Sequence, residues 1–238
     1  MSTDQFTDLP PIIEPHFARP NGVLHSGDRL KREEFHRLYE QTPPGFKAEL
    51  IGGIVYVASP VSPAHGKVDR LLGSLLAAYE GSTPGIEGSC NTTVFLSDKD
   101  ELQPNQYLRI LPEFGGQSNT VEDGYVSGGP ELVVEVAYSS QAIDLHAKKR
   151  RYARNGVHEY MVACVKEQQL RWFDLAGGQE LHPDANGVCR VRTFPGLWID
   201  GKALMTHDYS KLMDTLQQGL ATPEHAAFVQ ELESRRGK

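Results

Sequence analysis

The sequence predicts an α/β core followed by a C-terminal helical appendage. Two amphipathic helices, expected near residues 66–80 and 141–155, are interspersed with short apolar segments typical of strands. The segment Leu132–Ala137 is almost continuously apolar, as in strands that are buried on both faces of a sheet. After residue 200 only helical patterns follow. The mixed order of strands and helices therefore indicates a layered α/β core of roughly 140 residues.

The composition is that of an ordinary globular protein, with 39% hydrophobic and 23% charged residues among 238. At this length, one domain with appendages is the expected organisation. The formal net charge of −7 excludes a general positive field that would attract nucleic acid. A phosphate-bearing partner would therefore have to be bound locally or through metal ions.

The cysteines and the N-terminal segment fit a reducing compartment. Cys90, Cys164 and Cys189 are widely spaced and form no CxxC pair, so we expect reduced thiols and no zinc clip. Residues 1–21 are acidic and proline-bearing, without the basic flank and apolar stretch of a signal peptide. No apolar run approaches the roughly 18 residues of a spanning helix. We expect a cytoplasmic protein with no membrane association.

The first part of the chain is expected to form a helix, a hairpin and a long helix. Apolar residues recur at roughly helical spacing within residues 27–41. Residues 47–59 contain two strand-like runs separated by Gly52-Gly53, a favourable hairpin turn. The clearest helix begins after Ser62-Pro63, because six apolar residues then follow at i, i+3, i+4, i+7, i+8 and i+11.

The middle of the chain is expected to contain strands and loops. We expect a loop at residues 82–89 and strands at 92–96 and 107–111, separated by a charged turn at 97–101. The glycine-rich residues 115–129 are expected to form a long surface loop.

The remaining elements follow from capping and periodicity. A serine before residue 141 and Gly156 delimit the helix expected at 141–155. Further strands, a packing segment and two C-terminal helices are expected at 159–165, 170–175, 194–199, 208–218 and 223–235.

The most informative single residue is Glu135, an acid within the most apolar segment of the chain. Burying an unpaired carboxylate costs several kcal/mol. Glu135 therefore either points outward at a sheet edge or is compensated by a cation, namely a lysine or a metal ion. The motifs GxGxxG, GxxxxGK[ST], HExxH and GxSxG are absent, which disfavours the commonest nucleotide-binding, zinc-protease and serine-hydrolase classes.

The helix expected at 141–155 carries Asp144, Lys148 and Tyr152 at successive i, i+4 positions, which places them on one face. Lys148 is then positioned to reach back toward the sheet. The alternative is a solvated charge stripe with a routine Asp144–Lys148 ion pair. Residues 148–151 also form a dense basic run, which indicates either a solvent-exposed helix face or local contacts to phosphate.

An ordered series of short motifs gives the chain a resemblance to a known family. The series comprises Glu49-Leu50-Ile51-Gly52-Gly53, Ser59-Pro60, Ser62-Pro63 with His65, Gln103-Pro104-Asn105, residues 130–136, Asp144, Lys148, Tyr152, Gly156-Val157 and Glu159-Tyr160. Over roughly residues 27–200 this series resembles the Uma-type restriction endonuclease family, a branch of the PD-(D/E)XK nuclease superfamily.

The resemblance implies a restriction-endonuclease-like mixed β-sheet core flanked by helices, and a metal-dependent endonuclease that hydrolyses DNA phosphodiester bonds. In that superfamily an early acid, a Pro-Asp aspartate and a strand glutamate hold one or two divalent cations beside a lysine. In this chain Glu49 matches the early acid and Glu135 the strand glutamate. Lys148 matches the lysine, which in this branch lies on the following helix. Mg²⁺ or Mn²⁺ is the implied cofactor and DNA the implied partner.

The chain departs from the family pattern at the aspartate, because Pro104 is followed by Asn105. An amide oxygen can ligate Mg²⁺, but it is neutral, so a site of Glu49, Asn105 and Glu135 has one charge fewer to offset the ion. The backbone carbonyl of Val136 is a further expected ligand. Activity is then weakened, or a neighbouring carboxylate such as Asp144 substitutes, or the protein is a binding relic.

Three neighbouring residues each have two interpretations. His65 either covers the surface near the start of its helix or points into the cleft. Tyr152 is either a core aromatic or a site residue. Gln103 is either an exposed turn residue or a donor that supports the metal ligands.

These observations leave three hypotheses. The first is a Mg²⁺- or Mn²⁺-dependent endonuclease acting on DNA; cleavage of both strands would suit a homodimer with twofold symmetry. The second is a catalytically impaired module that binds nucleic acid or protein on the same scaffold. The third is an unrelated protein in which Glu135 simply pairs with Lys148. We expect an N-terminal extension (1–26), a nuclease domain (27–200) and the helical appendage (201–238).

Overall fold

The central strand is β9 (Leu132–Ala137), all six residues of which are buried. The structure is a computed structural model and describes residues 24–237. β9 lies between β10 (Glu159–Cys164), which is parallel to it, and β6 (Gln106–Ile110), which is antiparallel. The sheet is therefore mixed, as predicted. Its strand order is β12-β11-β10-β9-β6-β3, where the outer strands are Gln179–Leu181 (β12), Gln169–Asp174 (β11) and Ile86–Ser89 (β3).

A second sheet contains the hairpin predicted at Gly52-Gly53. β1 (Ala48–Ile51) and β2 (Ile54–Val57) pair through this turn, where φ is 64° and 80° at the two glycines, values that other residues rarely adopt. The strand order is β2-β1-β5-β4-β8-β7. The other strands are Val94–Ser97 (β4), Asp100–Leu102 (β5), Asn119–Thr120 (β7) and Val126–Ser127 (β8).

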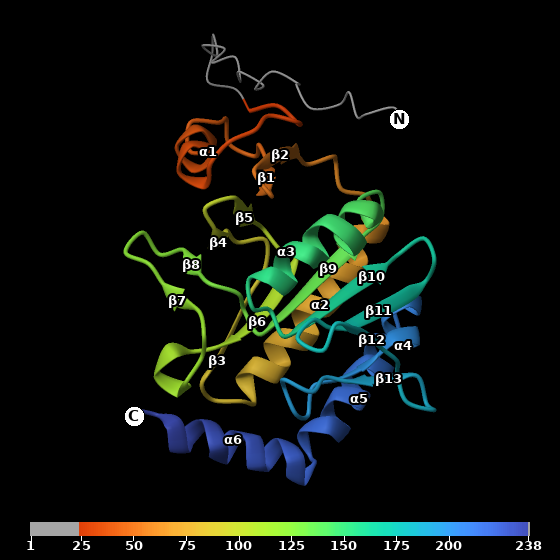
Figure 1. The fold of residues 1–238 in the computed structure, drawn as a ribbon. Coiled ribbons are helices and arrows are strands. Elements are labelled where there is room, and N and C mark those ends of the chain that lie inside the picture. Colours follow the sequence, from red (N-terminus) through yellow and green to blue (C-terminus); the bar gives the residue numbers. More distant parts are fainter. Residues whose placement is uncertain (1–23, 238) are drawn as a thin grey trace, which may run out of the picture.

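Helices cover both faces of the mixed sheet (Figure 1). α2 (Pro63–Gly81) packs against one face, and its buried residues are the six apolar residues that the periodicity predicted. The other side carries a π-helical segment, η2 (Ile143–Lys148), which continues into α3 (Lys149–Arg154). The smaller α1 (Arg32–Tyr39) packs Phe35 and Leu38 against the second sheet, in a core that Leu24 also enters.

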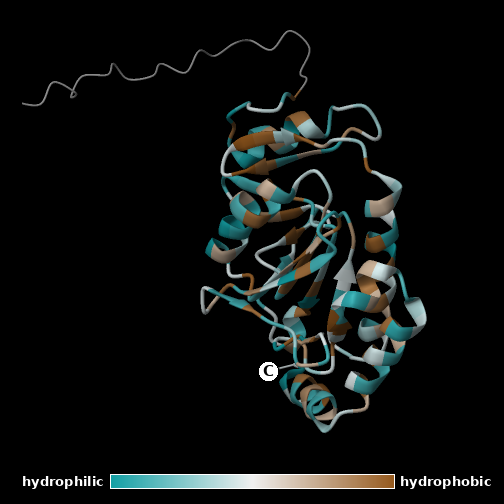
Figure 2. Cartoon of the chain, turned by 90° about the vertical axis from the view of Figure 1, so that its right-hand side faces the viewer, coloured by the Kyte–Doolittle hydropathy of each residue, from teal (hydrophilic) through white to brown (hydrophobic). Residues whose placement is uncertain are grey.

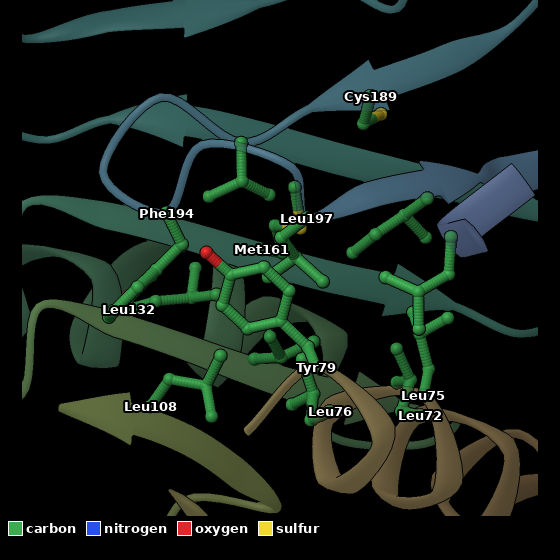
Figure 3. Close-up of a cluster of buried hydrophobic side chains, with 14 of the residues drawn as sticks. Leu72, Leu75, Leu76, Tyr79, Leu108, Leu132, Met161, Cys189, Phe194 and Leu197 are labelled. Carbon is green, nitrogen blue, oxygen red and sulfur yellow. The ribbon is translucent and has the colours of Figure 1, made fainter. Parts of the chain in front are cut away.

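The C-terminal helices share the main hydrophobic core with α2. They are α4 (Gly201–Thr206), α5 (Tyr209–Leu220) and α6 (Pro223–Arg235), preceded by the two-stranded pair β13 (Val188–Arg190) and β14 (Trp198–Asp200). Figure 3 shows Leu72, Leu75, Leu76 and Tyr79 of α2 facing Leu108, Leu132, Met161, Phe194 and Leu197. In Figure 2 the helices around the sheet carry both hydrophobic and hydrophilic residues, as expected of helices with one buried face.

The structure corrects several local expectations. Residues 82–89 include strand β3, the turn expected at 97–101 includes the start of β5, and the expected loop at 115–129 includes the short strands β7 and β8. A 3₁₀ turn, η1 (Pro112–Phe114), precedes that loop. These strands carry few apolar residues, and pairing with neighbouring strands defines them rather than their own pattern. The helix expected at 141–155 begins with the π-helical segment.

Of the predicted N-terminal extension, residues 1–23 lie outside the described residues. Among residues 24–237, no helix combines the length and the apolarity needed to cross a membrane.

Candidate functional site

Four charged side chains from both sheets and from the helical segment that leads into α3 meet around one ammonium group. The Nζ atom of Lys148 lies 2.8 Å from Oε2 of Glu49, 3.0 Å from Oε1 of Glu135 and 3.7 Å from Oδ1 of Asp144. We call these four residues the Lys148 cluster. Glu135, Asp144 and Lys148 are buried, and Glu49 is partly exposed.

The members of the Lys148 cluster come from three different elements. Glu49 lies in β1 of the second sheet, and Glu135 lies in the central strand β9 of the mixed sheet. Asp144 and Lys148 both lie in the π-helical segment, whose wider turns are frequent at functional sites. Two sheets and one helix therefore converge on one ammonium group.

Hydrogen bonds hold the two glutamates in place. The backbone N–H of Gln103 donates to Oε1 of Glu49 at 2.7 Å. The hydroxyl of Tyr152 donates to Oε1 of Glu135 at 2.9 Å, and the backbone N–H of Asn105 lies 3.2 Å from Oε2. Because every oxygen of these carboxylates accepts a bond, their orientation is fixed.

Asn105 connects the Lys148 cluster to α2. Its side-chain oxygen accepts a hydrogen bond from the backbone N–H of Val136 at 2.9 Å, and its side-chain nitrogen lies 3.5 Å from Nε2 of His65. Nδ1 of His65 is buried and has no hydrogen-bond partner within the described residues. Burial lowers the pKa of His65, although Asp69 and the Val136 backbone oppose that shift.

The charge balance of the Lys148 cluster is uneven. Three carboxylates surround one ammonium group, so the fully ionised cluster would carry a formal charge of −2, from three negative charges and one positive. Burial raises the pKa of Glu49, Glu135 and Asp144, and Lys148 opposes the shift in each case. Burial alone would lower the pKa of Lys148, but the carboxylates, Glu135 foremost, raise it overall. Lys148 is therefore charged at neutral pH.

The donor atoms of this region are suited to a hard divalent cation. Carboxylate and amide oxygens are the ligands that Mg²⁺ prefers, and the charge excess of −2 matches one such ion. No group of three or more His, Cys, Asp or Glu side chains between residues 24 and 237 is arranged to hold a metal ion. A cation here would therefore also need neutral oxygens, such as those of Asn105 and the Val136 backbone.

The structure brings together all the residues that the sequence singled out. Glu49, Asn105, Glu135, Lys148 and the backbone of Val136 are linked by direct contacts. Glu135 does not point outward at a sheet edge but is buried against Lys148. Asp144 and Lys148 are buried as well, so they do not form a solvated charge stripe.

The three neighbouring residues also contact this region. The Tyr152 hydroxyl bonds Glu135, the Gln103 backbone bonds Glu49, and His65 adjoins Asn105. The side chain of Gln103 donates to the hydroxyls of Tyr39 and Thr93 rather than to the acids.

Sequence reasoning missed a second ionic link between the helix and the second sheet, formed by Asp100 of β5 and Arg151 of α3. The guanidinium of Arg151 donates from Nε and Nη2 to the two carboxylate oxygens of Asp100, both at 2.7 Å. Ser97 and the backbone N–H of Gly52 donate to the same carboxylate. The only available signal was the position of Arg151, three residues after Lys148 and thus on a neighbouring part of the same helix face.

Comparisons with known proteins concern the family and the fold. A family model described as "Putative restriction endonuclease" matches residues 32–202. Among solved structures, the chain is similar to the crystal structure of a "putative nuclease" from Anabaena variabilis, with a TM-score of 0.59 and 13% sequence identity, over 71% of this chain and 96% of that chain. At this identity the likeness concerns the fold alone. A comparison with curated proteins gave no match.

The matched segment begins with α1, ends within α4 and includes every member of the Lys148 cluster. The resemblance predicted from the motifs and the restriction-endonuclease-like α/β fold are thereby confirmed. Because the family model spans well over half of the sequence, the chain belongs to the Uma2 family, whose members are described as putative restriction endonucleases.

Proposed function

We propose that the protein is a divalent-metal-dependent endonuclease that hydrolyses phosphodiester bonds in DNA at the Lys148 cluster. The observation that carries this proposal is the excess of buried acid: three carboxylates converge where a single lysine offsets only one of them. Such an arrangement costs stability in the absence of a cation, so we infer that it is kept for binding one.

In this proposal Glu49, Glu135, Asn105 and the carbonyl of Val136 hold Mg²⁺ or Mn²⁺. When bound, such an ion polarises the scissile phosphate and lowers the pKa of an attacking water. Tyr152 and the backbone N–H of Gln103 orient the two glutamates. The ammonium group of Lys148 stabilises the negative charge that develops on the phosphate oxygens.

The test is cleavage of supercoiled plasmid with Mg²⁺, with Mn²⁺ and with a chelator. We expect nicking only with metal, and at least a hundredfold loss in Glu135→Gln, because the variant removes a charged ligand without changing side-chain size. Glu180→Gln is the matched control, since Glu180 pairs with Arg171 and forms no ion pair with a member of the Lys148 cluster. Thermal unfolding with and without metal gives a second readout, because a bound ion raises the melting temperature of the wild type more than that of Glu135→Gln.

Asn105→Asp provides a gain-of-function test. The substitution adds the negative charge missing from the superfamily pattern, and the aspartate still accepts the bond from the Val136 N–H. We expect the Mn²⁺ concentration for half-maximal nicking to fall several-fold.

The competing hypothesis is a catalytically impaired binding module. It would be supported if the wild type bound DNA in a salt-sensitive manner but left it intact in both metals, and if Asn105→Asp did not restore cleavage. Metal-independent nicking that survives Glu135→Gln would contradict our proposal directly.

A further inference from the structure

Three large hydrophobic side chains of the described residues are exposed beside α2 or at the end of the mixed sheet. Among residues 24–237, three large hydrophobic side chains are exposed: Val61 (63%), Tyr138 (37%) and Tyr209 (51%). Val61 precedes α2, Tyr138 follows β9, and Tyr209 begins α5. A single exposed residue of this type needs no explanation, but Val61 directly precedes α2 and Tyr209 shares a hollow with Lys67 and Arg70 of that helix, so exposed apolar and cationic side chains adjoin along α2.

Register and contacts place Tyr138 and the start of α2 at the C-terminal end of β9. β9 and β10 are parallel with Ala137 opposite Cys164, so Tyr138 and Lys166 emerge at the same end. The first turn of α2 reaches this end as well, because His65 contacts Asn105, which bonds Val136. The Lys148 cluster includes Glu135 near this end of β9, so Tyr138 lies at the same end of the sheet as the proposed active site.

Cations accompany the aromatic side chains. Nζ of Lys166 lies 4.9 Å from the centre of the Tyr138 ring. Tyr209 lines a hollow of about 500 Å³ between α2 and α5, together with Lys67, Arg70, Leu71, Ser74 and His207. Lys67 and Arg70 are exposed and form no ion pair with any other part of the described chain. On a protein of net charge −7, these unpaired cations mark a local site for anions.

We define the β9-end surface as Val61, Lys67, Arg70, Tyr138, Lys166 and Tyr209. Aromatic rings interleaved with cations are typical of sites for unpaired nucleic acid, because the rings stack on bases while the cations contact phosphates. A duplex keeps its base faces stacked inside the helix, so non-specific binding to it rests on phosphate contacts. The β9-end surface has only three cations, so its chemistry favours single strands.

Helical geometry shows where the hollow lies relative to His65. On α2, Lys67, Arg70 and Ser74 lie about half a turn around the axis from His65, and roughly 3–14 Å further along it. The hollow is therefore a flanking contact, separate from the Lys148 cluster and reached over the start of α2.

We propose that the β9-end surface binds a single-stranded segment of DNA, with Tyr138 and Tyr209 stacking on bases and with Lys67 and Arg70 contacting phosphates. The inference rests on the proposed function in that it makes DNA with unpaired bases, such as a flap or bubble, the substrate of the Lys148 cluster.

The experiment measures binding without cleavage. Fluorescence anisotropy with a labelled oligonucleotide and its duplex, in the presence of chelator, gives both affinities. We expect the single strand to bind at least tenfold more tightly than the duplex. Tyr138→Ala and Tyr209→Ala should each weaken single-strand binding at least fivefold, the equivalent of about 1 kcal/mol per stacked base, whereas Tyr209→Phe should retain it.

The salt dependence tests the cations separately. Lys67→Ala with Arg70→Ala should reduce the slope of log affinity against log salt by about 0.7 for each lost phosphate contact. The control Arg236→Ala removes a cation just after α6, which lies at the opposite end of the molecule (Figure 1), and should leave the slope unchanged.

Each result separates this inference from the proposed function. If the duplex binds as tightly as the single strand, or if both tyrosine-to-alanine variants bind like the wild type, the inference is wrong even when plasmid nicking occurs. If the single strand is preferred and the tyrosines matter while no metal cleaves the plasmid, the inference stands and the proposed function fails.

Discussion

The Lys148 cluster and the Asp100–Arg151 pair connect the same two parts of the molecule with opposite charge balances. Lys148 reaches Glu49 in β1, and Arg151, one turn further along the helix, reaches Asp100 in β5 of the same sheet. In the pair, one carboxylate meets one guanidinium and two further donors. In the cluster, three carboxylates share one ammonium group.

This difference separates a structural contact from a candidate active site. Removing either member of a balanced buried pair leaves an uncompensated charge, which is costly. Removing one acid from an acid-rich cluster relieves repulsion, so most of that cost is cancelled. The Asp100–Arg151 pair should therefore be sensitive to the loss of its acid, and the Lys148 cluster only to the loss of its lysine.

The largest effect is expected for Lys148→Met. The variant leaves three buried carboxylates without their cation, and breaking a buried ionic network from one side typically costs about 3–5 kcal/mol. Urea denaturation at neutral pH measures the change in the free energy of unfolding. The control is Arg150→Met at an exposed position two residues away, which should change stability by less than about 0.5 kcal/mol. Equal stability of the two variants would show that the acids need no cation.

The next largest effect is expected for Asp100→Asn. The amide keeps the size of the side chain but cannot accept both guanidinium bonds together with those from Ser97 and Gly52. Loss of hydrogen bonds to a charged partner predicts a decrease in the free energy of unfolding of about 2–3 kcal/mol. A decrease below 1 kcal/mol would mean that the pair contributes little to joining α3 to the second sheet.

The stability difference between the wild type and Asp100→Asn should also depend on pH. Burial alone would raise the pKa of Asp100, but the bonds from Arg151, Ser97 and Gly52 outweigh it and lower the pKa overall. A carboxyl group with a lowered folded-state pKa stabilises the protein above its unfolded pKa, near 3.9, and loses that contribution as the pH falls through the folded-state value. The stability gap between wild type and Asp100→Asn should therefore narrow below about pH 4. A constant gap down to pH 2 would contradict this assignment.

Much of the fold could be predicted because several elements carry their own pattern. α2 and α6 have side-chain N-caps and regular apolar spacing, and β9 and β10 are mostly apolar apart from one glutamate in each. β3 could not be predicted, since Ile86 is its only buried residue and its pairing with β6 defines it as a strand. The π-helical segment was also missed, because its wider turn depends on the packing of Asp144 and Lys148 rather than on local propensity.

Only those residues of the candidate site could be predicted whose type is unusual for their place in the sequence. Glu135 attracted attention as an acid in an apolar strand, and Lys148 as a cation on the following helix. The contact between Lys148 and Glu49 spans 99 residues, the difference of the two positions, and depends on how the sheets pack. The link from Asp100 to Arg151 has no sequence signal of its own, because Asp100 lies in a stretch with the composition of a turn.

A smaller effect is expected for Glu135→Gln, although it also removes a buried carboxylate. The side-chain oxygen still accepts bonds from Lys148 and Tyr152, and Lys148 keeps Glu49 and Asp144 as partners. The new amide nitrogen faces the N–H of Asn105 unfavourably, which offsets the relief of repulsion. We expect the free energy of unfolding to change by less than about 1 kcal/mol, measured by urea denaturation alongside Asp100→Asn. A loss as large as that of Asp100→Asn would remove the distinction between the two regions.

The smallest effect is expected for Glu180→Gln. This variant tests whether the Asp100–Arg151 pair owes its strength to burial or to its bidentate geometry. Arg171 meets Glu180 through the same two guanidinium nitrogens that Arg151 uses for Asp100, but both side chains of this pair are about a third exposed. Water screens such a pair, so the loss should stay below about 0.5 kcal/mol and shrink further at high salt. Urea midpoints for both variants at low and high salt make the comparison. If Glu180→Gln lowered the free energy of unfolding as much as Asp100→Asn, the bidentate geometry rather than burial would account for the strength of the Asp100–Arg151 pair. Charge balance would then no longer explain how this pair differs from the Lys148 cluster.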